Sequence, residues 1–263
     1  MKILTIANLK GGVAKTVTAV NTSYVLASEH GKRVLLVDAD QQGNATQFYG
    51  RYGYDKPSMS DILTQSKPIK EVIQPTGITN LDIVPANLSL AKAEKDVLLD
   101  AGGVPQQIRL REALRAVRDD YDYVIIDNAP SLGMAVINAL ATSDKLIIPV
   151  KVDKFTFDGV DTMLEQAERV QQYFNPQLRF MGTLVTSYRR NDLNRQGAEW
   201  LQQAAVYKVF DTRIRWTEKV DESTFSSEPV MIHSPRCGAA KDYKAFVNEL
   251  LAMLSDSDTR EGE

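Results

Sequence analysis

Six short apolar runs, spread along a chain of 263 residues, constrain the fold more than any other feature of the sequence. Each run is continuously apolar rather than alternating with polar residues, as expected of strands that are covered on both faces. Stretches with helical spacing lie between the runs, for example 160–174, "VDTMLEQAERVQQYF". This order predicts an α/β fold, with a mostly parallel twisted sheet and helices on both faces. The runs are 2–7, 33–38, 81–85, 123–127, 145–150 and 180–186.

The rest of the pattern predicts one domain. No internal repeat or low-complexity linker divides residues 1–254. Residues 255–263 hold four acids and one arginine, and we expect them to form an acidic, disordered tail. This tail accounts for the whole net charge of −3, so the remaining chain is near neutral. The total charge therefore gives no reason to expect nucleic-acid binding, which would have to depend on local patches.

Composition also excludes several classes of site. A single cysteine, Cys237, rules out a disulfide within the chain, and one cysteine with two histidines argues against a zinc cluster. No apolar run approaches the roughly 18 residues of a membrane span. The first ten residues are too short for a secretion signal, because glycines follow at once. We expect a cytoplasmic protein that binds no membrane.

A glycine-containing segment, "NLKGGVAKTVT" at 8–18, joins the first expected strand to the first expected helix. A helix N-terminus after a strand offers free N–H groups and the positive end of a dipole to an anion. Gly11 and Gly12 would let the backbone approach phosphate oxygens. Lys15 would reach the β- and γ-phosphates, and the Thr16 hydroxyl would bind Mg²⁺. The segment therefore predicts a phosphate-binding loop.

This loop departs from the usual pattern G-x-x-x-x-G-K-[ST] at both required glycines. Leu9 and Ala14 stand at those positions, and an additional lysine, Lys10, precedes the glycine pair. The residues alone leave three explanations open: a damaged loop, a simple glycine-rich turn, or a variant with a second lysine.

Three aspartates follow two of the expected strands. Asp38 and Asp40 end the strand at 33–38, and Asp127 ends the strand at 123–127. Ligands of doubly wound sheets bind outside the carboxyl ends of the strands. An aspartate behind an apolar strand is also the arrangement that holds Mg²⁺ in nucleotide-binding proteins. The acids therefore strengthen the interpretation of 8–18 as a phosphate-binding loop.

The segments "KGGVAKT", "LLVDADQQGNAT" and "VIIDNAPSLG", in this order and spacing, resemble the deviant Walker A ATPases of the ParA/MinD superfamily. The chain is most similar to the short ParA or Soj-type partition ATPases, and the similarity runs along almost its whole length. In that family the loop reads KGGxxK[TS], so Lys10 corresponds to its signature lysine. The resemblance implies a P-loop ATPase domain at 1–254 that uses ATP and Mg²⁺.

The family also implies roles for these residues. Two subunits would enclose two ATP molecules, with Lys10 reaching the phosphates bound by the other subunit, much as an arginine finger does. Lys15 would act within its own subunit, and Asp40 would orient the attacking water, so Lys10, Lys15 and Asp40 are the candidate catalytic residues. Thr16, Asp38 and Asp127 are the candidate magnesium ligands. The nucleotide-binding set is Lys10, Gly11, Gly12, Val13, Ala14, Lys15, Thr16 and Val17.

Some positions differ from the family pattern. Val17 stands where a threonine is usual, which removes a hydroxyl contact to the α-phosphate. None of the differences removes a charge that the chemistry needs. The segments "QQGNAT" and "NAPSLG" resemble the two loops that sense the γ-phosphate.

DNA binding is the family activity that fits best. The chain end is acidic, unlike the basic membrane helix of MinD-like proteins, and no segment before the first strand is long enough for a helix-turn-helix domain. Residues 186–219 hold seven Lys or Arg against four acids. Contact without sequence preference needs only neutralisation of phosphates. The candidate DNA-binding residues are Arg189, Arg190, Arg213, Arg215 and Lys219.

The resemblance therefore implies a partition ATPase associated with the nucleoid. Its ATP-bound homodimer would bind nonspecific double-stranded DNA and hydrolyse ATP when stimulated by a ParB-like centromere-binding protein. A plasmid, chromosome region or mobile element would be positioned in this way. Two alternatives stay open. One is a related ATPase that positions a protein cargo, such as a chemoreceptor cluster or a microcompartment. The other is a small-molecule phosphotransferase.

Overall fold

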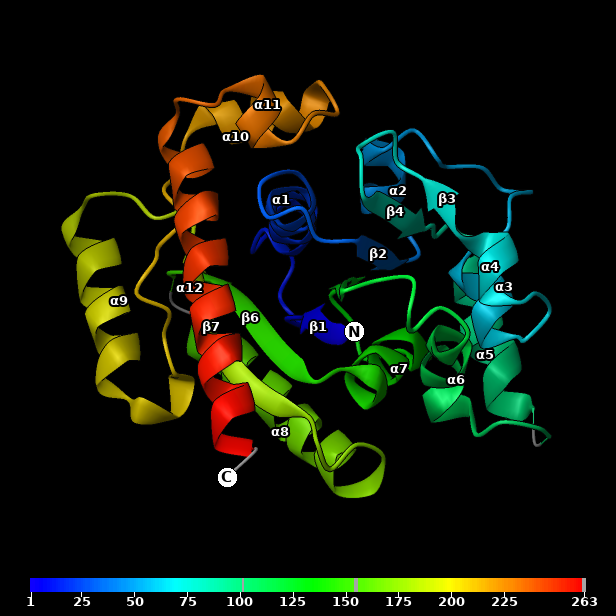
Figure 1. Ribbon diagram of the computed structural model, residues 1–263. Helices are drawn as coiled ribbons and strands as arrows, with labels where there is room; N and C mark the ends of the chain where they lie inside the picture. Colours follow the sequence, from blue (N-terminus) through cyan, green and yellow to red (C-terminus); the bar gives the residue numbers. More distant parts are fainter. Residues whose placement is uncertain (101, 154–155, 262–263) are drawn as a thin grey trace.

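The computed structural model describes residues 1–100, 102–153 and 156–261. One seven-stranded sheet forms the centre of the chain, in the order β3-β4-β2-β5-β1-β6-β7 (Figure 1). Every neighbouring pair is parallel except β3 and β4. The strands are β1 Lys2–Ile6, β2 Val34–Ala39, β3 Gln74–Pro75, β4 Leu81–Val84, β5 Tyr123–Asn128, β6 Lys145–Lys151 and β7 Arg179–Thr186. The predicted α/β class and all six predicted strands are confirmed. Only the two-residue edge strand β3, which contains a proline, was missed.

Helices follow most of the strands, as the alternating pattern predicts. No helix in the described ranges is both long enough and apolar enough to cross a membrane. The α-helices are α1 Lys15–Ser28, α2 Asn44–Phe48, α3 Met59–Leu63, α4 Ile69–Val72, α5 Ser89–Leu99, α6 Arg109–Arg115, α7 Met134–Thr142, α8 Thr156–Tyr173, α9 Asp192–Gln203, α10 Glu218–Phe225, α11 Val230–His233 and α12 Gly238–Glu261. The described residues also form two 3₁₀ turns, η1 Gln106–Ile108 and η2 Ala205–Tyr207.

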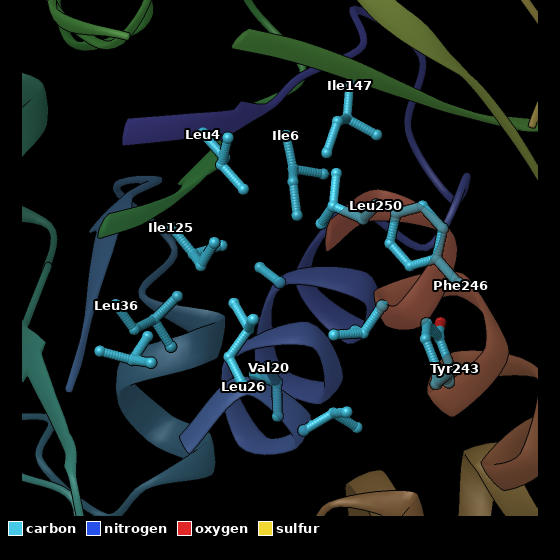
Figure 2. Close-up of a cluster of buried hydrophobic side chains, with 14 of the residues drawn as sticks. Leu4, Ile6, Val20, Leu26, Leu36, Ile125, Ile147, Tyr243, Phe246 and Leu250 are labelled. Carbon is cyan, nitrogen blue, oxygen red and sulfur yellow. The ribbon is translucent and has the colours of Figure 1, made fainter. Parts of the chain in front are cut away.

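Helices α1 and α12 cover one face of the sheet. Side chains that point to this face from four neighbouring strands, among them Leu36 and Ile125, pack against Val20 of α1 and Phe246 of α12 (Figure 2). All four are 1% exposed or less. Burying such side chains contributes about 1.5 to 3 kcal/mol each. The packing fixes α1, and therefore the loop before it, against the centre of the sheet.

The opposite face is covered by α3, α5, α6 and α7 over the first half of the sheet, and by α7 and α8 over β6 and β7. Alternate residues of the same strands supply it: Leu35 and Val37 of β2, and Val124 and Ile126 of β5. Both faces are thus buried. This explains why the strands are continuously apolar in the sequence.

Residues near the end of the chain belong to the last helix. Residues 255–261 form the last turns of α12. No glycine or proline interrupts residues 239–261, and the Ser255 hydroxyl donates to the Leu251 carbonyl oxygen one turn back, at 2.9 Å. The helix therefore continues through the acidic residues up to Glu261. Residues 262–263 lie outside the described ranges, and the single domain at 1–254 stays a prediction.

The strand register brings the predicted site residues together. β5 lies between β1 and β2, and Asp127 pairs with Ile6 on one side and with Asp38 on the other. All three strands are parallel, so their carboxyl ends share one edge. The segment at 8–14 leaves β1 at that same edge and enters α1. The fold therefore places the loop and the aspartates side by side.

Two residues at helix starts adopt the same left-handed backbone conformation. Ala14 precedes α1 with φ 63° and ψ 33°, and Gly43 precedes α2 with φ 63° and ψ 35°. Side chains disfavour this region, because Cβ approaches the following carbonyl. At Gly43 space is also lacking: a Cβ would lie 2.7 Å from the Ala86 carbonyl oxygen. The two sites share a backbone conformation but carry different residues.

We therefore predict that exchange of alanine and glycine destabilises the protein at position 43 but has little effect at position 14. Gly43→Ala is expected to lower the free energy of unfolding by roughly 2 kcal/mol, from left-handed strain and from overpacking against Ala86. Ala14→Gly relieves strain but adds freedom to the unfolded chain, so a change below about 1 kcal/mol is expected. Urea unfolding of both variants measures this. Equal losses at the two sites would contradict the assigned conformations.

Candidate nucleotide-binding site

The loop at 8–14 is anchored to two strands. The Asn8 side chain donates to the Pro149 carbonyl oxygen at 2.8 Å and accepts from the Lys10 backbone N–H at 2.9 Å. At the other end of the loop, the Thr186 hydroxyl donates to the Val13 carbonyl oxygen at 3.1 Å. These bonds tie the loop to β6 and β7. The sheet thus holds both ends of the loop.

The glycine pair faces open space. A Cβ on Gly11 or Gly12 would meet no atom within 4 Å, and Gly12 has a positive φ of 72°. Ala14 keeps the left-handed conformation that a glycine at this position of the pattern would supply. The missing glycine therefore does not change the local backbone geometry, and the loop leaves room for an anion above the N-terminus of α1.

Lys15 lies beneath the loop. Only 7% of it is exposed, and its Nζ donates to the Lys10 carbonyl oxygen at 2.9 Å. Burial lowers the pKa of its ammonium, while the charges of Asp127 and Asp40 oppose that effect. An anionic ligand in the loop would add a further favourable charge. The side chain is held close to the place where a bound phosphate would lie.

Lys10 points to the other side of the loop. Its Nζ contacts both carboxylate oxygens of Asp153, which follows β6, and the side chain is 26% exposed. Asp153 was not among the predicted site residues, because no motif marks a single acid 143 residues away from Lys10. The two lysines of the loop therefore have separate environments, one buried beside Asp127 and one near the surface beside Asp153.

Asp127 is a fully buried carboxylate near the Thr16 hydroxyl and the Lys15 ammonium. Neither of its carboxylate oxygens accepts a hydrogen bond of good geometry from the described residues. Burial, followed by the neighbouring charge of Asp38, raises its pKa well above the ordinary value, and the nearby Thr16 hydroxyl opposes this rise. A buried carboxylate without partners is costly unless a cation compensates it. Asp127 and Thr16 thus fit a magnesium ion.

Asp38 is buried, and its carboxylate accepts three hydrogen bonds. It accepts from the Asp40 N–H at 3.1 Å, the Thr46 N–H at 2.8 Å and the Thr46 hydroxyl at 2.7 Å. Burial raises its pKa to about 6, and these hydrogen bonds oppose the shift. The carboxylate organises the segment after β2. Direct binding of a metal ion by Asp38 would have to displace part of this bonding.

Asp40 lies at the start of the segment that follows β2. It is 6% exposed, and its carboxylate accepts from the Gln42 N–H at 2.9 Å. Its charge also acts on Lys15 and Asp127. The structure thus brings Asp38, Asp40 and Asp127 to one edge with Lys15. Within the described ranges, no three acidic, histidine or cysteine side chains form a complete metal cage. That suits Mg²⁺, which takes most ligands from phosphates and water.

A cavity of about 510 Å³ opens next to the loop, between α1, α2 and α10. This volume falls within the range of small-molecule pockets. Most of the residues that line this cavity were not predicted from the sequence, because they follow no motif. The lining residues are Thr16, Val17, Val20, Asn21, Asn44, Gln47, Phe48, Ser223, Thr224 and Ser227.

Four of the five predicted DNA-binding residues lie on two adjacent segments, and Lys219 lies in α10. Backbone bonds from Tyr188 to Ile214 and from Trp216 to Tyr188, both 2.9 Å, join 187–190 to 213–216. Arg189 and Arg190 are exposed. The Arg189 guanidinium stacks over the Trp216 ring, 4.1 Å from its centroid. The structure thus places these arginines on one surface.

The other three basic residues of this set contact side chains elsewhere in the chain. Arg215 makes three hydrogen bonds of 2.7 to 3.1 Å to the Asp242 carboxylate. Arg213 stacks on Tyr188 at 5.2 Å, and Lys219 pairs with Glu222 at 2.7 Å. Arg215 therefore contributes to fixing α12, in addition to any role on the surface.

Comparisons with known proteins agree with this geometry. A family model described as an AAA domain matches residues 1–180. The sporulation initiation inhibitor protein Soj of Bacillus subtilis is 38% identical over 253 residues, covering 95% of this chain and 98% of that protein. The chromosome partitioning protein ParA of Caulobacter vibrioides is 33% identical, with coverages of 99% and 97%.

A solved structure is similar as well. It is described as cobyrinic acid a,c-diamide synthase from Mycobacterium smegmatis with a bound ATP analogue and magnesium. Its TM-score is 0.84 at 30% identity, covering 98% of this chain and 97% of that one. The AAA domain match and the near full-length identity to Soj and ParA give the same assignment. The chain belongs to the AAA domain family and to the family of Soj and the ParA chromosome partitioning proteins.

Proposed function

We propose that this protein is an Mg²⁺-dependent partition ATPase that moves DNA cargo. The observation that carries the proposal is the buried Asp127 carboxylate, which accepts no well-formed hydrogen bond among the described residues and lies near Thr16 and Lys15, at the edge of the sheet where the loop at 8–14 leaves β1. Such a carboxylate is expected where a cation and phosphates complete the site. The names of the relatives, Soj and chromosome partitioning protein ParA, support DNA segregation as the process.

ATP fits the loop and the cavity together. Lys15 and the N–H groups of residues 11–16 would hold the β- and γ-phosphates, and the cavity beside α1 would take the ribose and base. Bound Mg²⁺ neutralises developing phosphate charge. Thr16 and Asp127 would hold the ion, with Asp38 positioning the segment behind them. Asp40 would orient the attacking water. The ATP analogue and magnesium in the similar M. smegmatis structure support this assignment.

Lys10 would complete the site of a second subunit. In the single chain its ammonium contacts Asp153 rather than the phosphate-binding side of the loop. Contact with a partner's phosphate would therefore require exchange of this ion pair. ATP binding and homodimer formation would then be coupled, because each bound γ-phosphate attracts the lysine of the opposite subunit.

The surface formed by Arg189, Arg190 and Arg213 would bind the phosphates of nonspecific double-stranded DNA. A ParB-like centromere-binding protein would stimulate hydrolysis and reset the cycle, at the nucleoid. A small-molecule phosphotransferase would behave differently, since it would consume ATP only with its acceptor. Hydrolysis by the purified protein with DNA and Mg²⁺, but without any acceptor, therefore tests the proposal. If ATP is not consumed and DNA is not bound in any nucleotide state, the proposal fails.

The two loop lysines form a matched pair for testing the site. Lys15→Ala is expected to weaken ATP affinity by about 10- to 100-fold, because a charged hydrogen-bond donor to phosphate is lost. Lys10→Ala removes the same charge from the same loop. It is expected to keep ATP affinity within about threefold and to lose ATP-dependent dimerisation. Titration with a fluorescent ATP analogue and light scattering measure the two effects. Equal loss of affinity in both variants would place Lys10 in its own subunit's site.

Asp127→Asn is expected to stabilise the nucleotide-free protein and to slow ATP hydrolysis. It removes a buried charge that Lys15 and Thr16 offset only in part, so the nucleotide-free protein should gain about 1 kcal/mol or more at pH 8. A raised folded-state pKa means that ionisation costs stability as pH rises above the unfolded value, so the gain should shrink at pH 5. Mg²⁺-dependent hydrolysis should fall at least tenfold.

Asp38→Asn is the control for this prediction. Its carboxylate accepts three hydrogen bonds, and an amide group cannot accept all of them, so a loss of stability is expected. Thermal unfolding at pH 5 and pH 8 compares the two variants. If Asp127→Asn destabilises the protein at both pH values, the interpretation of Asp127 as a charge offset only in part is wrong.

Arg190→Glu is expected to weaken DNA binding in the ATP state and to lower the log-log salt slope by about one or two units, because phosphate contacts release counterions. Arg190 is a better probe than Arg215, whose replacement would also break the bonds to Asp242. Arg118→Glu makes the same charge change at an exposed residue just after α6 and is the control. Helices α6 and α9 are on opposite sides of the view in Figure 1. Fluorescence anisotropy across a salt series measures affinity. Equal effects of the two variants would exclude the 187–216 surface.

A further inference from the structure

Helix α5 contacts the segment that follows β2. The Thr46 hydroxyl donates to Asp38 at 2.7 Å and accepts from the Ala86 N–H at 2.8 Å. Ala86 lies on the short connection that leads from β4 into α5. The same connection is packed against Gly43, since a Cβ there would meet the Ala86 carbonyl oxygen. The connection that leads into α5 is thus bonded, through one threonine, to a buried carboxylate of the candidate site.

The same helix contacts the segment that follows β5. Glu94 lies in the middle of α5, and its carboxylate accepts from the Ala135 N–H at 2.8 Å, in the first turn of α7. The carboxylate also occupies the place that a side chain at Gly133 would need. Gly133 precedes α7 and carries no capping side chain. Glu94 of α5 therefore supplies the hydrogen-bond acceptor that the start of α7 lacks.

The bond forms on a packed interface. Leu90 and Val97 of α5 belong to the same buried cluster as Met134 and Ala135 of α7. Glu94 lies on this side of the helix, whereas the nearby Asp96 is exposed. The distance between α5 and the start of α7 is thus fixed by apolar contacts, and the carboxylate sets the position of the last residues before α7.

We propose that Glu94 is a positioning residue for ATP hydrolysis, and that α5 couples the two segments on either side of the reacting phosphate. The first segment, 40–46, carries Asp40 and is bonded to Ala86, on the short connection that leads into α5. The second, 129–133, follows Asp127 and Asn128 and ends where Glu94 binds. A shift of either segment would move α5 and therefore the other. This inference rests on the proposed ATPase function.

The coupling predicts a specific kinetic effect. Lys15 and Thr16 bind nucleotide from α1, and no hydrogen bond from α5 reaches them among the described contacts. Loss of the Glu94 acceptor should therefore leave ATP affinity within about twofold. The hydrolysis rate should fall roughly fivefold, which is the factor given by loss of one helix-capping acceptor.

Four variants of the full-length protein test this. Glu94→Ala removes the acceptor, and Glu94→Gln keeps one acceptor oxygen. Gly133→Ala displaces the carboxylate without changing it, and Asp96→Ala removes a charge from the exposed side of the same helix. Each is measured with Mg²⁺-ATP and double-stranded DNA for nucleotide affinity and single-turnover hydrolysis. Amide hydrogen exchange of residues 128–136 is followed in the same state.

Glu94→Ala and Gly133→Ala are expected to slow hydrolysis and to speed exchange at 128–136, with nearly unchanged affinity. Their double variant should be no worse than either one, because both remove the same bond. Glu94→Gln should retain at least half of the wild-type rate, and Asp96→Ala all of it. Wild-type hydrolysis and exchange in Glu94→Ala would overturn the proposal. Additive losses in the double variant, or Glu94→Gln as impaired as Glu94→Ala, would also overturn it.

These outcomes are separable from failure of the proposed function. If wild-type protein hydrolyses no ATP with Mg²⁺ and DNA, the ATPase assignment fails, and the coupling fails with it. If wild-type protein hydrolyses ATP and Glu94→Ala matches it in both rate and exchange, only the coupling through α5 fails.

Discussion

The position of β5 between β1 and β2 is the constraint on which the rest of the site depends. Parallel pairing in this order places Asp127 beside both Ile6 and Asp38. The loop after β1, the segment after β2 and the segment after β5 then share one edge of the sheet. No one of them makes a nucleotide site alone. The apolar side chains on both faces of the three strands hold this order, so the core also determines the geometry of the charges.

That geometry concentrates unfavourable charge at the centre of the molecule. Asp38 and Asp127 are fully buried neighbours, and burial raises the pKa of both. Asp38 accepts well-formed hydrogen bonds from Asp40 and Thr46, whereas Asp127 accepts none among the described residues and has the nearby Thr16 hydroxyl and Lys15 charge to offset part of its burial. The local instability is therefore confined to a single carboxylate that faces Lys15 and the loop. Sites of this kind are stabilised by their ligands and lose stability in the ligand-free protein.

The sequence allowed the fold class, the six long strands and the grouping of the aspartates to be predicted, because each depends on local patterns or on strand order. The contacts of individual side chains could not be predicted. Asp153 and Glu94 carry no motif, and their partners, Lys10 and Ala135, lie far away in the chain. Thr46 lies in the quoted segment "QQGNAT", but its bond to Ala86 depends on how the connection after β4 packs. Arg215 was expected on the surface for its charge, but its bonds to Asp242 depend on where α12 packs. The acidity of residues 255–263 led to the expectation of a disordered tail, which stays a prediction; residues 255–261 form the last turns of α12.

The contact between Lys10 and Asp153 has a consequence for how firmly two copies would hold together. A lysine that already has a carboxylate partner gains little free energy when it exchanges this partner for a phosphate, because one ion pair replaces another. The contribution of Lys10 to the assembly would then be a small difference between two similar terms. A small net contribution of this kind is sensitive to ionic strength, which screens ion pairs. Such an arrangement favours repeated cycles over a permanent complex.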